Sequence, residues 1–235
     1  MLLLLGGDIE TNPGPVSPTE LRFSKSIIAG TVHQGSPQFL VTGSGASTCM
    51  TNSLVALAYT HIRDISHWNS TVIDSVLYLG KLLYDKIYPN RYNKDSSAYL
   101  EVQDLQTSFT LGHKHFSSYP CTSSVGFLAN VSVSNTQTAF ESAFQISPRA
   151  ILIVKDYGMA VFIIDNKFHL FDPHSRNDQG YLDPDGHAVL VTFQTRNDLC
   201  AHLRKLTSTL TKESLENVPF EITPIVVFTV TKPYL

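Results

Sequence analysis

The sequence contains little cysteine, and its few cysteines are poorly spaced for cross-linking. Three cysteines occur in 235 residues, Cys49, Cys121 and Cys200. An odd number at such wide spacing excludes a disulfide framework and a zinc site built from closely paired ligands. We therefore expect no bound metal, and we expect the chain to work in a reducing compartment, the cytoplasm or the nucleus.

Positive charge and long apolar runs are also scarce. The 17 lysines and arginines are spread along the chain against 20 acidic residues, which gives a formal net charge of −3. This leaves no basic stripe for a nucleic-acid backbone. No run approaches the roughly 20 apolar residues of a membrane span. The initial MLLLLGG lacks both the basic residues and the length of a secretory signal. We expect neither a nucleic-acid nor a membrane partner.

The first 25 residues carry a distinctive motif. The segment GDIETNPGP, residues 7–15, contains the pattern Asp-x-Glu-x-Asn-Pro-Gly-Pro and resembles the 2A-type ribosome-skipping peptides of picornaviruses and some mobile elements. The resemblance implies that the bond between Gly14 and Pro15 is skipped during synthesis, so that the working protein begins at Pro15. The alternative is a leader without a role, since a Pro/Gly-rich segment builds no packed structure in either case. We assign residues 1–25 to a leader and linker.

The order of the predicted elements indicates the fold class. A short strand or turn is expected over residues 26–32. Apolar residues at three- and four-residue spacing predict amphipathic helices over 50–62, 70–88, 97–109, 136–145 and from Asp198 onward. Runs of β-branched and aromatic residues predict strands over 150–155, 160–164, 168–172, 188–193 and 220–230. Pro224 should place the last strand at an edge or a bulge. This order predicts one α+β domain over 26–235, with a helical N-terminal half packed on a mostly antiparallel sheet.

The first candidate site residue is Cys49. It stands where the glycine-rich segment GSGAST, residues 43–48, runs into the helix predicted from residue 50. A thiol at this place lies near the free N–H groups of the first helical turn, where the helix dipole favours an anion. The position suits a nucleophilic thiolate.

Asp172 and His174 are the candidate partners of this thiol. They lie in FDPHSRNDQG at the end of a predicted strand, where side chains two residues apart point to the same face. An aspartate beside an imidazole fixes the tautomer of the ring and stabilises its protonated form. The two residues could then serve Cys49 as base and orienting group, although an Asp-x-His pair near a turn is commonly only a satisfied polar pair.

Three segments together carry a family resemblance. HQGSPQF, STCMTNSLVALAY and FDPHSRNDQGYLDPDGHAVLVTF, in this order, resemble the deubiquitinating cysteine protease domain at the N-terminus of herpesvirus large tegument proteins, and related domains in mobile elements. The resemblance spans about residues 26–195. It implies a papain-like cysteine protease fold and removal of ubiquitin from lysine side chains, so that ubiquitin or ubiquitin-conjugated proteins are the expected partners.

The same resemblance implies roles for individual residues. Cys49 is the expected nucleophile, and Asp172 and His174 complete the triad. Gln34 is the expected donor to the oxyanion hole, and the slightly wider spacing to Cys49 leaves Gln38 as the alternative donor. Relatives often have glutamine immediately before the nucleophile, where this chain has Thr48.

Other functions compete with this interpretation. Gly43 and Gly45 begin a G-x-G dinucleotide fingerprint, but Thr48 takes the place of the third glycine and no lysine forms a phosphate loop. The peptidase could instead process a viral or mobile-element polyprotein. A catalytically silent ubiquitin-binding module is disfavoured by the intact set of Cys49, Asp172 and His174. We predict a monomeric cysteine peptidase that acts on ubiquitin without a cofactor.

Overall fold

The computed structural model describes residues 25–40, 48–87, 100–128 and 133–231. The predicted leader and linker, apart from Lys25, and the glycine-rich residues 43–47 lie outside the described residues. Within the described part of the chain, no helix combines the length and the apolar character needed to span a membrane.

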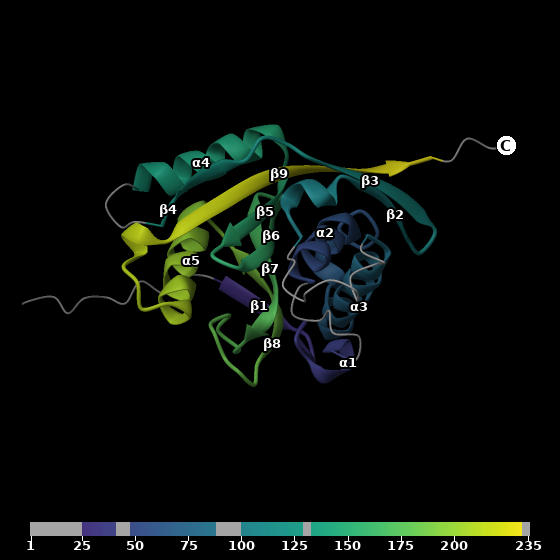
Figure 1. Ribbon diagram of the computed structural model, residues 1–235, viewed down its shortest axis with the longest axis horizontal. Coiled ribbons are helices and arrows are strands. Elements are labelled where there is room, and N and C mark those ends of the chain that lie inside the picture. Colours follow the sequence, from purple (N-terminus) through teal and green to yellow (C-terminus); the bar gives the residue numbers. More distant parts are fainter. Residues whose placement is uncertain (1–24, 41–47, 88–99, 129–132, 232–235) are drawn as a thin grey trace, which may run out of the picture.

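An antiparallel sheet forms the centre of the protein. Its strands are β1 (Lys25–Ala29), β2 (Thr107–Leu111), β3 (Lys114–Pro120), β4 (Ser124–Phe127), β5 (Arg149–Val154), β6 (Tyr157–Ile164), β7 (Lys167–Arg176), β8 (His187–Phe193) and β9 (Pro219–Val230). Their order is β1-β8-β7-β6-β5-β9-β3-β2, and β4 pairs with the first half of β9 (Figure 1). The tight turn between β6 and β7 places Asp165 and Asn166 at positive φ, a conformation that these two residue types tolerate.

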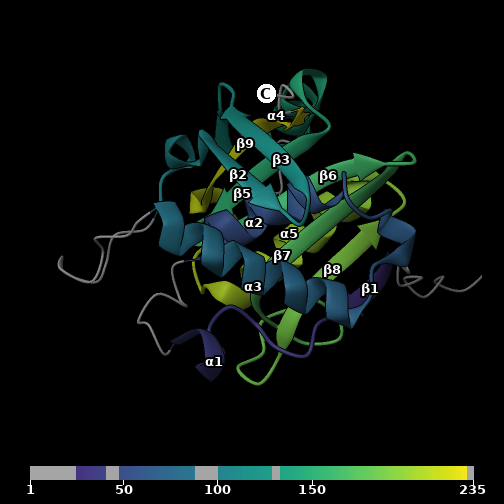
Figure 2. The ribbon, with the colours of Figure 1, turned by 90° about the vertical axis from the view of Figure 1, so that its right-hand side faces the viewer.

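Helices cover both faces of this sheet. They are α1 (Pro37–Leu40), α2 (Cys49–Tyr59), α3 (Ser70–Ile87), α4 (Val133–Ile146) and α5 (Arg196–Leu210). Figures 1 and 2 show α2 and α3 on one face and α4 and α5 on the other. Successive strand residues alternate between two cores, so Ile151 packs with α2 and α3 whereas Leu152 packs with α4 and α5. The predicted α+β class, with helices of the N-terminal half packed on a mostly antiparallel sheet, is confirmed.

Helix α2 is buried on every side. All residues from Cys49 to Ala58 are buried, because β6 and β7 lie against one side of the helix and α3 lies against the other. The sequence predicted an amphipathic helix with Ile62 on its buried face. That prediction is wrong, since α2 ends at Tyr59 and Ile62 is 37% exposed. A helix enclosed in this way holds its side chains more rigidly than a surface helix would.

The helix predicted over 97–109 is a second error. Residues 97–99 lie outside the described residues, and the rest forms a 3-10 turn (Val102–Leu105) followed by strand β2. Pairing with β3 overrides the helical spacing, since Phe109 lies opposite Phe116 and the two rings stack with centroids 5.7 Å apart. Strands β3 and β4 occupy a region for which the sequence predicted no element.

Of the two positions predicted from Pro224, an edge strand or a bulge, the edge is wrong, because strand β9 is central in the sheet. Its neighbours are β5 on one side and both β4 and β3 on the other. The pairing with β4 ends at Ile222 and the pairing with β3 begins at Ile225. The missing N–H of Pro224 therefore falls where β9 changes partner, and the Pro224 carbonyl still accepts a hydrogen bond from the Cys121 N–H.

The other predicted helices and strands are confirmed, with shifts of a few residues at their ends. Helix α5 begins two residues before the predicted Asp198. The reason is a capping box in which the Thr195 hydroxyl accepts from the Asp198 N–H and the Asp198 carboxylate accepts from the Thr195 N–H. Cys200 is buried on this helix, and all three cysteines are free thiols.

Candidate active site

Cys49 is the first residue of α2, as the sequence predicted. Its side chain is buried and packs against the beginning of β6. A Cβ atom added to Gly158 would lie 3.3 Å from the Cys49 Sγ and 2.7 Å from the Met50 Sδ. Only glycine at position 158 therefore lets β6 approach the thiol this closely. The Ser53 hydroxyl donates to the Gly158 carbonyl and ties the helix to the same strand.

Asp172 and His174 lie on β7 and form the predicted pair. The His174 Nδ1 lies 2.6 Å from the Asp172 Oδ1, and the His174 backbone N–H donates to the same oxygen at 3.0 Å. A carboxylate only accepts, so Nδ1 carries the proton and Nε2 is the ring nitrogen left for another partner. The Cys49 side chain is close enough to His174 to contribute to raising its pKa. The thiol, the imidazole and the carboxylate therefore lie next to one another.

Charged neighbours outweigh burial in setting the pKa values of His174 and Asp172. Burial acts to lower the pKa of His174, but the charge and hydrogen bond of Asp172 and the contact with Cys49 outweigh it and raise that pKa. Burial acts to raise the pKa of Asp172, but Arg176 and His174 hold it well below its usual range.

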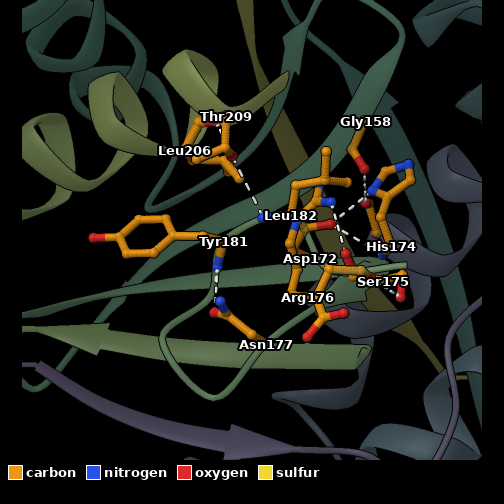
Figure 3. Close-up of polar contacts among 12 residues, drawn as sticks. Gly158, Asp172, His174, Ser175, Arg176, Asn177, Tyr181, Leu182, Leu206 and Thr209 are labelled. Carbon is orange, nitrogen blue, oxygen red and sulfur yellow. Dashed lines mark hydrogen bonds and ion pairs between the residues drawn. The ribbon is translucent and has the colours of Figure 1, made fainter. Parts of the chain in front are cut away.

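Arg176 is a site residue that the sequence analysis missed. Its Nε donates to the Asp172 Oδ2 at 2.6 Å, and the whole side chain is buried (Figure 3). Asp172 therefore uses one carboxylate oxygen for His174 and the other for Arg176. The signal was available, because residues 172, 174 and 176 alternate on one strand and share a face.

Tyr157 packs against the same two residues. Its ring meets the His174 ring edge to face with centroids 4.8 Å apart, and the Arg176 guanidinium lies 5.1 Å from its centroid. Tyr157 opens β6 directly before Gly158, so one short segment contacts both the thiol and the imidazole. No sequence pattern pointed to this residue.

The loop after β7 is folded back on itself next to Asp172 and His174. The Ser175 hydroxyl donates to the Asp183 carbonyl, and the Asn177 side-chain oxygen accepts from the backbone N–H groups of Gln179 and Tyr181 (Figure 3). These bonds anchor the end of β7 immediately beyond His174.

Gln34 joins the site from the turn that follows β1, whereas Gln38 does not. Gln34 is 4% exposed, and its backbone N–H donates to the Pro173 carbonyl at 2.9 Å. Its Oε1 accepts a hydrogen bond of 3.3 Å from the Nδ2 of Asn52, one helical turn after Cys49. Gln38 lies exposed on α1. Of the two glutamines the sequence left open, the structure brings Gln34 to the beginning of α2.

Thr48 occupies the position before the thiol and is also buried. Its hydroxyl oxygen accepts from the Asn52 Nδ2 at 3.0 Å, and its carbonyl accepts from the Asn52 N–H.

The residues Gly43 and Gly45 of the dinucleotide interpretation lie outside the described residues. Among the residues that are described, no three His, Cys, Asp or Glu side chains are grouped to hold a metal ion. The arrangement brings together a thiol, an imidazole hydrogen-bonded to a carboxylate, and a carboxamide.

Comparisons with known proteins identify the family and the fold of the chain. Residues 29–226 match the family model described as herpesvirus tegument protein, N-terminal conserved region. A search of curated protein sequences finds no match. Among solved structures, the chain is similar to the ubiquitin-specific protease encoded by a murine cytomegalovirus tegument protein, crystallised with a ubiquitin-based suicide substrate. The TM-score is 0.68 at 14% identity, over 89% of each chain. This likeness confirms the predicted papain-like fold.

Proposed function

The chain belongs to the family of herpesvirus tegument protein N-terminal conserved regions, and from this premise we propose that it is a deubiquitinating cysteine peptidase. The observation that carries the proposal is the hydrogen-bonded pair of His174 and Asp172 with the Cys49 side chain beside the imidazole. The fold likeness to a protease crystallised with a ubiquitin-based substrate supports ubiquitin as the partner.

In the first half of the reaction the Cys49 thiolate attacks the carbonyl carbon of the C-terminal glycine of ubiquitin. A C–S bond forms, and the carbonyl electron pair moves to the oxygen. Two groups donate hydrogen bonds to this oxyanion. One is the side-chain amide of Gln34, and the other is the backbone N–H of Cys49 at the beginning of α2. In well-studied enzymes such a donor lowers the barrier by about 2.7 to 4 kcal/mol.

His174 then transfers protons in both directions. As an imidazolium it protonates the leaving lysine amine while the C–N bond breaks, which leaves a thioester on Cys49. As a neutral base it next takes a proton from water, whose oxygen attacks the thioester carbonyl. The C–S bond then breaks, which releases the C-terminal carboxyl group of ubiquitin and returns Cys49 as a thiolate beside the protonated His174. Asp172 keeps the proton of the ring on Nδ1, so that Nε2 performs both transfers.

The same site would also serve a peptidase that processes a polyprotein. The skipping motif of residues 8–15 favours this second candidate, because such motifs separate the products of one long reading frame. We propose that the skip at Gly14 supplies the working chain and that ubiquitin remains the substrate. The intact set of Cys49, Asp172 and His174 disfavours a silent ubiquitin-binding module.

We propose that the protein works in the cytoplasm or nucleus of a host cell, as a monomer. Three free cysteines without a disulfide framework suit a reducing compartment.

Cleavage of diubiquitin joined through a lysine side chain tests the proposal. The full chain is incubated with this substrate, and monoubiquitin is followed on a gel. Monoubiquitin should appear with the wild type and not with Cys49→Ala. Binding without cleavage by the wild type would instead support the silent module. Absence of both would favour a polyprotein substrate.

A further inference from the structure

Asn52 connects two parts of the candidate site. It lies on α2 one turn after Cys49, and its side chain is completely buried. Its Nδ2 group donates to the Thr48 Oγ1 at 3.0 Å and to the Gln34 Oε1 at 3.3 Å. Both hydrogens of this amide are therefore engaged, one within α2 and one with the turn that carries Gln34.

This contact fixes which edge of the Gln34 carboxamide faces the helix. A carboxamide has an accepting oxygen edge and a donating NH2 edge. Because the Asn52 NH2 group only donates, it selects the oxygen edge of Gln34, and the Nε2 edge is turned away from Asn52. An oxyanion is stabilised only by the donating edge. With the opposite orientation, Gln34 would present an oxygen to a developing negative charge.

The surroundings of Asn52 oppose the reverse orientation. Its Oδ1 is buried and has no hydrogen-bond partner among the described residues. It faces α3, where a Cβ atom on Gly80 would lie 2.0 Å away. If the amide were turned over, its two N–H donors would face α3 without a partner. Buried N–H groups without a partner are rarer in proteins than buried carbonyl oxygens without one. An apolar residue would fill this helix contact without burying an unsatisfied oxygen, so packing alone does not account for asparagine here.

We propose that Asn52 is a positioning residue that orients Gln34 as the oxyanion donor. The inference rests on the proposed acyl-transfer function of Cys49 and deepens it. When the C–S bond forms and the carbonyl electron pair moves to oxygen, the Gln34 Nε2–H donates to that oxygen while Asn52 holds the other edge of the carboxamide. Asn52 itself touches neither the substrate nor the reacting atoms.

Two reactions of Cys49 separate this role from a structural one. Acyl transfer from p-nitrophenyl acetate passes through an oxyanion and needs no ubiquitin. Alkylation by iodoacetamide is a direct displacement that forms no oxyanion, so it reports only on the thiol and His174. The measurements compare the wild type, Asn52→Leu, Gln34→Ala and the double variant, after subtraction of the background given by Cys49→Ala.

The proposal expects a selective loss. Asn52→Leu and Gln34→Ala should each slow acyl transfer about 10- to 100-fold while changing alkylation less than about 3-fold. The double variant should be no slower than Gln34→Ala, because both changes remove the same donor. Thr51→Val is the matched control. It removes a buried hydroxyl that donates to the Thr48 carbonyl in the same turn, and acyl transfer should stay within about 2-fold.

Several outcomes would overturn the proposal. These are unchanged or faster acyl transfer in Asn52→Leu, an equal loss of both reactions, or effects that multiply in the double variant. If Asn52→Leu does not fold, Asn52→Ala replaces it. Failure of both to fold would assign Asn52 a structural role and also overturn the proposal. A separate measurement tests the ubiquitin function. The wild type is incubated with a ubiquitin aminocoumarin amide. If this substrate stays intact while acyl transfer from p-nitrophenyl acetate follows the expected pattern, only the ubiquitin function is contradicted.

Discussion

The backbone N–H of Gln34 donates a hydrogen bond of 2.9 Å to the carbonyl of Pro173, the residue between Asp172 and His174. This bond joins the turn that carries the carboxamide to the strand that carries the base. Strand β1, which precedes this turn, pairs with β8, and β8 pairs with β7. The sheet therefore holds the turn next to β7. Gln34 and His174 are therefore fixed relative to one another, although their positions differ by 140 in the sequence.

Replacing Asp172 by asparagine should abolish most of the activity without unfolding the protein. The asparagine amide can donate to Nδ1, which would move the ring proton to Nε2, the nitrogen that has to accept from the thiol. In a comparable triad this change lowers kcat about 10⁴-fold. Steady-state kinetics on a ubiquitin C-terminal amide measures the loss. A variant that retains more than about a tenth of the wild-type kcat would show that Asp172 does not orient His174.

Arg176→Met should destabilise the fold strongly. Arg176 is fully buried, and its removal leaves the Asp172 carboxylate buried without its second partner. Breaking a buried ion pair in this way costs about 3 to 5 kcal/mol. Arg176→Lys keeps the positive charge and should cost less. Urea unfolding at neutral pH gives both values, and equal stability of Arg176→Met and wild type would mean that the pair contributes nothing.

Gly158→Ala should impair the site more than the fold. The new methyl group would displace the Met50 sulfur and crowd the Cys49 thiol, so we expect at least about a 10-fold loss of kcat/KM. Gly112→Ala is the control, because Gly112 lies in the β2–β3 turn with open space around it and a φ of +57°. It should cost about 1 kcal/mol of stability and leave kcat/KM unchanged. The opposite ranking of the two variants would contradict the close approach of β6 to the thiol.

His202 should make the protein sensitive to mild acid. Burial, and next the charge of Lys25, lower its pKa to about 3, whereas an unfolded histidine titrates near 6.5. Because the unfolded chain binds this proton first, stability falls as the pH drops below about 6.5, and the loss continues towards pH 3. Between pH 7 and pH 5 the contribution is about 2 kcal/mol.

The variant His202→Phe tests this effect. Phenylalanine keeps the stacking on Tyr181 and Phe193, so the fold should be preserved. Its free energy of unfolding should decrease less between pH 7 and pH 5 than that of the wild type. Replacement of the exposed His113 by alanine should leave the acid sensitivity intact. Identical pH dependence of His202→Phe and wild type would rule out His202 as the source.

Much of the site was predictable because its chemistry is local in sequence. A thiol at the beginning of a helix and an Asp-x-His pair on a strand each depend on neighbours a few residues away. Arg176 shares the alternation of that pair and was overlooked. Asn52 and Tyr157 could not be found in this way, since their partners Gln34 and His174 come close only when separate elements pack together.

The errors in the fold have a similar origin. Periodicity shows which side chains are apolar, but it does not show how many neighbours an element will have. Helix α2 is enclosed because α3 covers it, which its own sequence does not specify. Residues 102–109 follow a helical spacing and nevertheless form a turn and strand, because β3 offers Phe109 a partner. Pro224 fits a central strand because the partner of β9 changes there.

The central claim is that the Cys49 thiol, activated by His174, attacks the C-terminus of ubiquitin. The most direct test is to incubate the full chain with ubiquitin that carries an electrophile at its C-terminus, and to map the adduct by peptide mass spectrometry. We expect a single adduct on Cys49 of the wild type and none on Cys49→Ala. An adduct on Cys121 or Cys200, an adduct on the Cys49→Ala variant, or no adduct on the wild type would contradict the claim.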